Sequence, residues 1–368
     1  MTNAVTETPD RPKFVIVGAG VIGKQHGKVM TELGDRVELV AVADVDLSRA
    51  EALAAERGGR PYASLADALA SEDIDVVTVC TPTGLHGVVA KEALAAGKHV
   101  IIEKPAEVTV EKTDEIIAAQ REAGTLVSVI SQHRFDPATD IAVAAIEAGE
   151  LGRLTSGIAS IDWWRGQTYY DSGDWRGTWE LDGGGAMMNQ GVHTVDLLIA
   201  AMGRPVEVFA YTGTLAHERV ETEDVAVAVV KFESGALGVI HATTAAYPGL
   251  SARVQIHGDK GSVVIDNDEL AYIHRAAYAA DQRDVSYGAN SETDNQKDSL
   301  DLPEKATAGA GRDPGQLSDA HRAQYLNILA ALQGREKLRV DLETNRQAIS
   351  VITGAYESAR TGQPVKLT

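Results

Sequence analysis

The tripeptide Glu103-Lys104-Pro105 contains the side chain best placed for chemistry in this sequence. It follows His99–Ile102, a β-branched run that predicts a buried parallel strand. Open α/β sheets bind ligands outside the carboxyl ends of their strands, which is where Lys104 would lie. Its ammonium group carries three donors and an exchangeable proton. We therefore predict that Lys104 is catalytic, with an inert surface charge as the alternative.

A glycine motif, Gly18-Ala19-Gly20-Val21-Ile22-Gly23, follows the predicted strand Phe14–Val17 and opens a predicted helix. In this setting G-x-G-x-x-G indicates dinucleotide binding, because the glycines permit a tight turn, approach of a pyrophosphate and close helix packing. The helix N-terminus adds N–H donors for phosphate. The alternative is a glycine turn without a cofactor. The predicted cofactor contacts are Gly18, Gly20, Val21, Ile22 and Gly23.

Asp44 ends the second predicted strand, Glu38–Ala43, and lies 21 residues after Gly23. A carboxylate there accepts hydrogen bonds from a ribose diol and repels a 2′-phosphate, so NAD is favoured over NADP. An ordinary turn aspartate is the alternative, since Asp46 lies in the same loop.

Further cofactor contacts are expected where later strands end. Thr81 and Pro82 follow the predicted strand Asp75–Cys80 and should shape the nicotinamide-ribose side. His86, in the next turn, could contact that ribose or simply be solvated. An oxidised nicotinamide is positive and would lower the pKa of a nearby lysine, which suits proton exchange with a substrate hydroxyl. The remaining predicted cofactor contacts are Glu103, Lys104, Gln132, Trp175 and Arg176.

A second constellation begins at the glycine run Gly183–Gly185, which leads into a predicted helix. Asn189, His193 and Asp196 fall at i, i+4 and i+7 of that helix, on one face. Their neighbours are largely apolar, and buried polar groups need partners. An amide and an imidazole that face a cleft could hold and titrate a sugar hydroxyl. We predict catalytic and substrate-binding roles for Asn189 and His193; the alternative is a structural His–Asp pair.

All four tryptophans of the chain lie within seventeen residues before that helix. Aromatic faces beside charged side chains are typical of carbohydrate-binding walls, although a core cluster of the second domain would have the same pattern. We expect Trp163, Trp175, Arg176 and the polar loop 279–319 to shape a sugar pocket. The cluster comprises Trp163, Trp164, Trp175 and Trp179, with Tyr169, Tyr170, Arg165, Arg176 and Asp174 nearby.

The pattern of elements predicts an α/β fold in two domains, as a length of 368 residues favours. Strands alternate with helices over the first 130 residues, which indicates a doubly wound parallel sheet of Rossmann type. After about residue 133, successive strands joined by short turns indicate a large, mostly antiparallel open sheet in an α+β domain. We place the boundary between 1–133 and 134–368.

Composition excludes several classes of function. The formal charge of −19 argues against electrostatic binding of nucleic acid or an anionic membrane. Cys80 is the single cysteine, so an intrachain disulfide or cysteine-rich zinc site is impossible. Neither H-E-x-x-H nor G-x-S-x-G occurs, and we expect no metal. The polar N-terminus and short apolar runs predict a cytoplasmic protein.

Together, the glycine motif, Asp44, Thr81-Pro82, the EKP triplet and the GGGAMMNQGVHTVDLL helix resemble the Gfo/Idh/MocA family of sugar and cyclitol oxidoreductases. The resemblance extends to Ala355–Ala359 in the last helix. It implies a Rossmann domain, a second domain whose open sheet serves a homodimer or homotetramer, and hydride transfer to or from a nicotinamide. It also implies that Lys104 and His193 are catalytic.

One departure from the family pattern affects the chemistry. Many inositol-dehydrogenase-like members carry aspartate where this sequence has Asn189, and an amide cannot take a proton. Proton transfer then depends on Lys104 or His193. The asparagine is similar to that of branches that act on sugar nucleotides or sugars, which argues against a plain myo-inositol dehydrogenase. We predict an NAD-dependent dehydrogenase of a secondary hydroxyl in a sugar, glycoside or cyclitol. The alternatives are an inositol dehydrogenase, a redox-neutral member with tightly bound NAD that works through a transient keto-sugar, and an NAD-binding regulator.

Overall fold

The structure is a computed structural model that describes residues 9–276, 295–300 and 318–368, and these form two units. The first unit contains residues 9–132, 179–183 and 318–349, and the second contains the other described residues. Our division at 133/134 assigned 179–183 and 318–349 to the second domain, whereas the structure places them in the first unit. The reason is apolar packing, because helix α9 (Ser318–Leu332) buries Tyr325 and Ile328 in the same core as Phe14.

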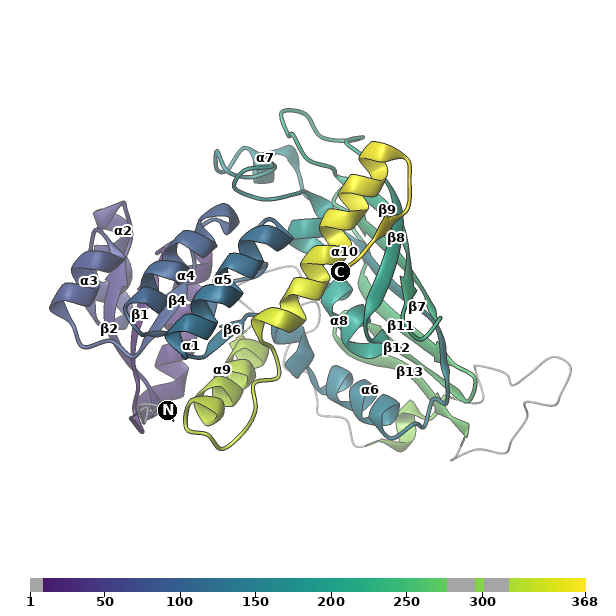
Figure 1. Cartoon of the computed structure of the whole chain (residues 1–368), viewed down its shortest axis with the longest axis horizontal. Helices are drawn as coiled ribbons and strands as arrows, with labels where there is room; N and C mark the ends of the chain where they lie inside the picture. The colour runs from purple at the N-terminus through teal and green to yellow at the C-terminus, as the bar shows by residue number, and fades with distance from the viewer. Residues whose placement is uncertain (1–8, 277–294, 301–317) are drawn as a thin grey trace, which may run out of the picture. The chain divides into compact units, whose positions relative to one another are not determined.

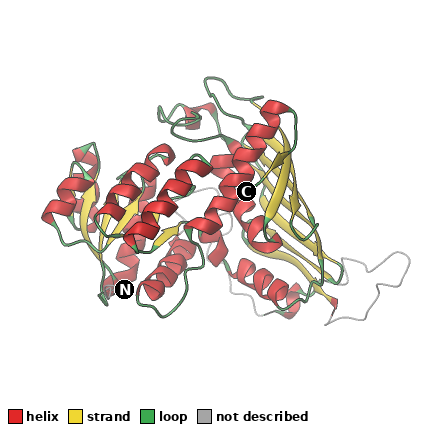
Figure 2. Ribbon diagram, in the orientation of Figure 1, coloured by secondary structure: helices red, strands yellow, loops and turns green. Residues whose placement is uncertain are grey.

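The first unit is built on a six-stranded parallel sheet in the order β3-β2-β1-β4-β5-β6, which confirms the predicted doubly wound fold (Figures 1 and 2). The edge strand β3 was not predicted, because it is short, largely exposed and contains Pro61. The strands are β1 (Lys13–Val17), β2 (Glu38–Ala43), β3 (Arg60–Tyr62), β4 (Val76–Val79), β5 (His99–Ile102) and β6 (Val127–Val129).

Helices connect these strands and cover the sheet. Side chains alternate along β1, so Phe14 and Ile16 enter the core formed with α1, α2 and α9. The caps are local, since Asp46, Ser64 and Thr109 accept N–H bonds at the starts of α2, α3 and α5. The helices are α1 (Val21–Leu33), α2 (Leu47–Arg57), α3 (Leu65–Ser71), α4 (His86–Ala95), α5 (Val110–Ala123), α9 and the first part of α10 (Leu342–Thr361).

The second unit is built on an eight-stranded sheet in the order β13-β12-β11-β7-β10-β9-β8-β14 (Figure 1). The pairing is antiparallel except between β7 and β10, which agrees with the predicted mostly antiparallel sheet. Its strands are β7 (Leu154–Asp162), β8 (Pro205–Gly213), β9 (Val225–Phe232), β10 (Leu237–Thr243), β11 (Ala252–Gly258), β12 (Gly261–Asp266), β13 (Glu269–Arg275) and β14 (Val365–Lys366).

Helices of the second unit cover one face of this sheet. Helix α8 (Val192–Met202) packs on β7 and β11, and α6 (Pro137–Glu147) packs on β12 and β13. The short helix α7 (Gln167–Tyr170) lies in the connection that follows β7. On the other face, alternate residues of β9 are exposed, and Val229 is 52% exposed. The sheet therefore leaves a partly apolar face uncovered within the described chain.

Two further expectations from the sequence concern the loop 279–319 and membrane-spanning segments. Most of the predicted 279–319 loop lies outside the described residues; of its described part, Lys297–Ser299 forms a short 3₁₀ turn. Among the described helices, none has both the length and the apolar character needed to cross a membrane.

Candidate active site

The glycine loop after β1 has the geometry that a dinucleotide needs. Gly18 has φ +100°, and a Cβ there would lie 2.5 Å from the Cys80 carbonyl oxygen. A Cβ on Gly23 would lie 2.0 Å from the Gly18 oxygen, so close packing requires both glycines. A Cβ on Gly20 would meet no atom within 4 Å, so the start of α1 is open to a ligand. Val21, at the first position of α1, is 70% exposed.

Asp44 lies beside this loop. One of its carboxylate oxygens accepts the Ala19 N–H at 2.7 Å, and the other accepts the Asp46 N–H at 2.9 Å. The aspartate therefore ties the end of β2 to the glycine loop. Each oxygen retains a second lone pair, so the predicted contact with a ribose diol is compatible with these bonds.

Two polar atoms at the carboxyl edge of the sheet are buried without a hydrogen-bond partner among the described residues. They are Thr81 Oγ1, after β4, and Gln132 Oε1, after β6. Buried polar atoms are normally paired, so both atoms could accept partners from a ligand. Both residues were predicted to contact the cofactor, and a bound dinucleotide could supply the absent partners.

His86 is buried rather than solvated, so the solvated alternative is wrong. Its Nδ1 lies 2.8 Å from the Pro105 carbonyl oxygen and its Nε2 lies 2.9 Å from the Thr81 carbonyl oxygen. Burial lowers the pKa of the imidazole. The ring links the end of β4 to the Glu-Lys-Pro segment. Because both nitrogens face protein carbonyls, the predicted contact with ribose stays a prediction.

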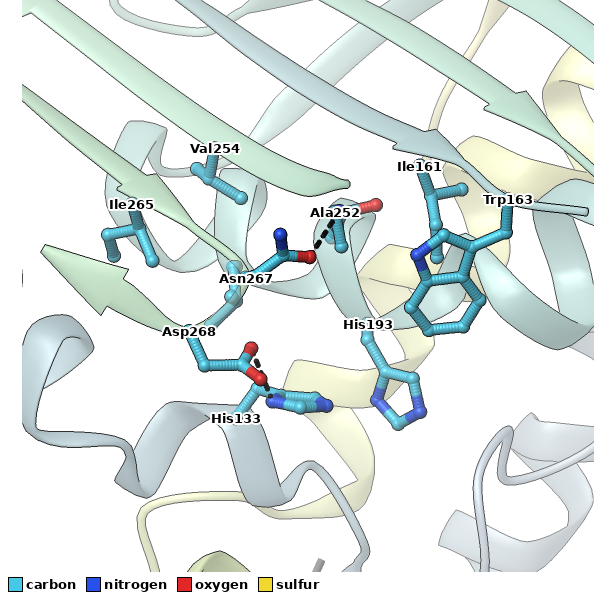
Figure 3. Close-up of a pocket in the computed structure, with 11 residues that line it drawn as sticks. His133, Ile161, Trp163, His193, Ala252, Val254, Ile265, Asn267 and Asp268 are labelled. Carbon is cyan, nitrogen blue, oxygen red and sulfur yellow. Dashed lines mark hydrogen bonds and ion pairs between the residues drawn. The ribbon is translucent and has the colours of Figure 1, made fainter. Parts of the chain in front are cut away.

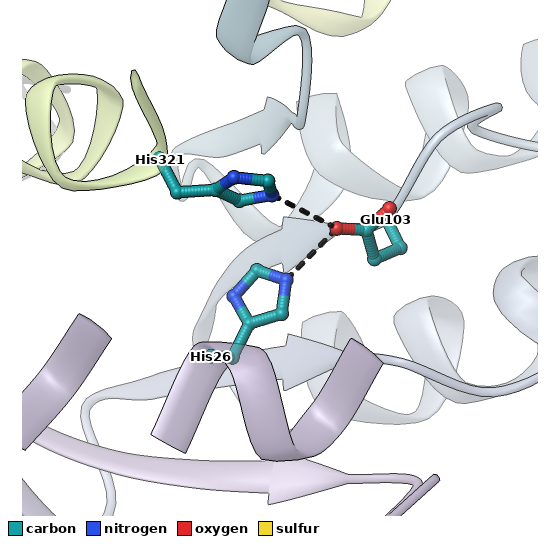
Figure 4. Close-up of side chains that lie close together, drawn as sticks. All are labelled: His26, Glu103 and His321. Atoms are coloured by element: carbon teal, nitrogen blue, oxygen red, sulfur yellow. Dashed lines mark hydrogen bonds and ion pairs between the residues drawn. The ribbon is translucent and has the colours of Figure 1, made fainter. Parts of the chain in front are cut away.

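Within the EKP triplet, Glu103 points inward to His26 and His321 (Figure 4). Glu103 Oε1 lies 2.9 Å from His26 Nε2 and 3.8 Å from His321 Nε2, while Oε2 accepts the Lys104 N–H at 3.0 Å. Burial opposes ionisation, but the two histidines hold the pKa of Glu103 well below its usual range. Lys104 is only half-buried. The carboxylate is therefore an internal anchor for the segment that carries the lysine.

In the second unit, the structure singles out two of the predicted catalytic residues. From Gly184 to Ile199 every residue is buried except Asn189 and His193. Asn189 lies in a π-helix, Ala186–Gln190, and His193 lies in the first turn of α8. These two polar side chains are thus the accessible part of an otherwise buried segment.

Asp196 has a different role from its predicted neighbours. It is 2% exposed, and Arg134 binds both of its carboxylate oxygens at 2.6 and 2.7 Å. The sequence placed Asp196 on one face with Asn189 and His193 by assuming regular α-helical spacing. The π-turn, closed by the Gly191 N–H to the Ala186 oxygen at 2.8 Å, interrupts that spacing.

His193 lines a pocket within the second unit (Figure 3). Its ring meets that of His133 edge to face, with centroids 4.9 Å apart. The polar wall also includes Asn267 and Asp268, at the turn between β12 and β13, and Trp163 is another lining residue. The apolar lining residues are Ile161, Leu197, Ala252, Val254 and Ile265.

His133 and Asp268 were not predicted as site residues. His133 Nδ1 lies 2.8 Å from an Asp136 oxygen and 3.0 Å from an Asp268 oxygen. Burial opposes the charge, but Asp268 and Asp136 outweigh it and raise the pKa of His133 to about 10. In the sequence, the adjacent Asn267 and Asp268 were the available signal, because these residue types are favoured in two-residue hairpin turns. In the structure both have the positive φ values that such a turn needs, 48° and 64°.

Among the residues that the structure describes, two clusters combine imidazole and carboxylate groups closely enough for a metal ion. They are His26, Glu103 and His321, and His133, Asp136 and Asp268. In each cluster, hydrogen bonds or ion pairs already join the nitrogen and oxygen atoms. The absence of a metal therefore stays a prediction.

The aromatic cluster divides into separate groups. The Arg165 guanidinium lies 4.9 Å from the centre of the Trp163 ring, while Arg176 lies 4.3 Å from the Tyr169 ring and 4.4 Å from the Trp175 ring. The other two tryptophans contribute differently: Trp164 packs on Tyr247, and Trp179, 45% exposed, belongs to the first unit. The four tryptophans therefore form neither one carbohydrate-binding wall nor one core cluster of the second domain.

The first unit has a dinucleotide-binding glycine loop at the edge of a doubly wound sheet, and the second unit has an accessible histidine. This combination is typical of dinucleotide-dependent oxidoreductases. Comparison with known proteins agrees. Residues 12–131 match the oxidoreductase family with an NAD-binding Rossmann fold, and residues 141–264 match the GFO/IDH/MocA C-terminal domain. The chain belongs to the Gfo/Idh/MocA family and is an NAD-dependent oxidoreductase.

Similar proteins support this assignment. The WlbA dehydrogenase of Chromobacterium violaceum, solved with NADH and UDP-GlcNAcA, is 32% identical with a TM-score of 0.85, over 98% of this chain and 97% of that one. The uncharacterised oxidoreductase YrbE of Bacillus subtilis is 32% identical over 68% of this chain and 73% of its own. The scyllo-inositol 2-dehydrogenase (NAD⁺) of the same organism is 28% identical over 69% and 73%. The predicted family, enzyme class and cofactor are therefore confirmed.

Proposed function

We propose that this protein oxidises a secondary hydroxyl of a sugar, glycoside or cyclitol, with NAD⁺ as hydride acceptor. The observation that carries the proposal is the selective exposure of Asn189 and His193 on a segment that is otherwise buried from Gly184 to Ile199. An accessible amide, with an accessible imidazole that lines a pocket, is suited to binding a polyol.

The proposed roles follow from the chemistry of each side chain. Asn189 orients the hydroxyl through its amide, because it cannot take a proton. Lys104 or His193 receives the hydroxyl proton as hydride leaves the same carbon, so that the products are a ketone and NADH. Gly20, Asp44, Thr81 and Gln132 would hold the dinucleotide, which supplies the hydride acceptor when bound.

Among the possible substrates, sugar nucleotides are the class that we favour. The relative with UDP-GlcNAcA bound is 32% identical over almost the whole chain, and Asn189 replaces the aspartate of many inositol-dehydrogenase-like members. The inositol alternative retains support from the scyllo-inositol relative at 28% identity. A panel of UDP-sugars, free sugars, glycosides and inositols separates these possibilities.

Purified protein with NAD⁺ and this panel tests the proposal by NADH absorbance. Turnover on a sugar or cyclitol that is lost in Lys104→Ala supports it. NAD that co-purifies, with substrate conversion but no net NADH, would instead identify a redox-neutral enzyme. Tight NAD binding with no conversion of any polyol would identify a regulator.

We also propose a homodimer or homotetramer formed through the open sheet. Tyr211, Val227, Val229 and Val239 are 70%, 45%, 52% and 40% exposed on neighbouring strands β8, β9 and β10. Covering such a face would bury apolar area. Light scattering after size-exclusion chromatography should give at least a dimer, and Val229→Glu should shift the mass toward the monomer.

A further inference from the structure

Glu223 binds three consecutive N–H groups at the start of the segment that carries Asn189 and His193. Gly185 donates to Glu223 Oε2 at 2.8 Å, and Met187 donates to Oε1 at 2.8 Å. Between them, Ala186 donates to the main-chain oxygen of Glu223 at 2.9 Å. The first N–H groups of a helix lack partners within the helix, and here one residue supplies partners for all three.

The glycine run before this helix is explained by the same contact. A Cβ on Gly185 would lie 1.7 Å from the Glu223 carbonyl oxygen, so no other residue fits there. A Cβ on Gly184 would lie 2.2 Å from the Tyr356 hydroxyl, which donates to Glu223 Oε1 at 3.0 Å. The turn is thus shaped around the Glu223 carboxylate and its donors.

The next residue, Asp224, holds the segment 215–217. Its carboxylate accepts the N–H groups of Leu215, Ala216 and His217 and also binds the His217 ring at 2.9 Å. The other ring nitrogen of His217 lies 2.6 Å from the main-chain oxygen of Arg165, whose guanidinium lies over Trp163. Glu223 therefore holds the segment that carries His193, and Asp224 is linked through His217 to Arg165, which lies beside the pocket residue Trp163.

We propose that ionised Glu223 is a positioning residue that holds Asn189 and His193 in their working arrangement. The proposal rests on the catalytic roles assigned above. A single π-turn is intrinsically less favourable than α-helix, so it needs anchors from outside. Protonation of Glu223 would remove the negative charge that strengthens the bonds from Gly185, Met187 and Tyr356, so its hold on the segment would weaken.

The surroundings of Glu223 bring the pKa of its carboxyl group close to neutral pH. Burial raises the pKa of the carboxyl to about 7, against the lowering effect of the Met187 and Gly185 N–H groups. The titratable groups near it are Tyr356, which donates to it, and Tyr170 and Asp224. The pKa of Tyr356 is raised well above its usual value, mainly by burial and further by the neighbouring Glu223 carboxylate. The Tyr356 hydroxyl therefore stays a neutral donor.

Hydrogen exchange tests the anchor without requiring a substrate. In Glu223→Gln, the amides of 184–191 should lose protection by about tenfold or more at pH 8, since a charge-assisted hydrogen bond is removed. Glu221→Gln, an exposed glutamate in the same loop, is the matched control and should leave protection unchanged. Equal protection in Glu223→Gln and the wild type would overturn the proposal.

The pH profile tests the link to catalysis. Wild-type kcat/KM should fall as the pH drops through about 7, and Glu223→Gln should lower kcat and abolish this limb. Tyr356→Phe removes a donor to the carboxylate, so the limb should move to higher pH. A merely structural role would lower the melting temperature but leave the limb in place, which would contradict the inference. If the wild type oxidises no polyol, the proposed function fails, whereas hydrogen exchange still decides this one.

Discussion

Arg134 binds Asp196 through a paired contact, from Nε at 2.6 Å and from the terminal nitrogen at 2.7 Å. The pair joins the segment that follows Gln132 to α8, on which His193 lies. Both side chains are almost fully buried.

Breaking this pair should destabilise the second unit. Removing one partner leaves an uncompensated buried charge, so Arg134→Ala should lower the free energy of unfolding by about 3–5 kcal/mol. Urea denaturation measures the loss. The double variant Arg134→Met with Asp196→Leu should lose less than Arg134→Ala alone, because no charge stays unpaired; an equal or larger loss would mean that the pair matters by its shape rather than its charge.

Lys104→Ala should lower kcat by about 10²–10⁴, the usual range for loss of a positioned proton-transfer group. Steady-state kinetics on the best substrate measure this, and NAD⁺ affinity by fluorescence titration should change little. Lys98→Ala is the matched control, since Lys98 precedes the other end of β5. Unchanged turnover in Lys104→Ala would remove the lysine from the mechanism.

Asp44→Ser should weaken NAD⁺ binding by about tenfold, since a carboxylate that accepts from the ribose diol contributes on the order of one charge-assisted hydrogen bond. Discrimination against NADP⁺ should fall as well, because a 2′-phosphate would meet no negative charge. The ratio of kcat/KM for the two cofactors is the measurement. Asp46→Ser, which alters only the cap of α2, should leave that ratio unchanged.

Stability should depend on pH through His133. Its pKa is raised from an ordinary value of 6.5 to about 10, so the folded state binds the proton more tightly than the unfolded chain. Its stabilising effect is complete below pH 6.5 and is lost as the pH rises through 10. The melting temperature of the wild type should therefore fall across this interval.

Asp268→Asn is the variant that isolates this effect, because asparagine tolerates the same positive φ as aspartate. It removes the largest contribution that raises the pKa of His133, so the fall in melting temperature between pH 7 and 10 should be smaller. The same fall in both proteins would assign the pH dependence to other groups.

The sequence alone determined features that depend on neighbouring residues. The alternation of strands and helices gave the parallel sheet, and the spacing of Gly18, Gly20 and Gly23 gave the turn that the structure contains. The position of Lys104 at the end of β5 followed from the same pattern. Such features are readable because the period of a strand or helix and the conformation of a glycine turn are local properties.

Only the tertiary structure decided which polar groups are partners. Glu103 meets His26 and His321, Asp196 meets Arg134, and Glu223 meets Gly185 and Met187. Each pair joins residues at least 36 positions apart, and a charged side chain carries no local sign of a partner at that distance. The π-turn is decided in the same way, because its start is anchored by Glu223 rather than by the helical preference of its own residues. Local patterns thus predicted where the chemistry lies, and long-range packing decided how each group is held.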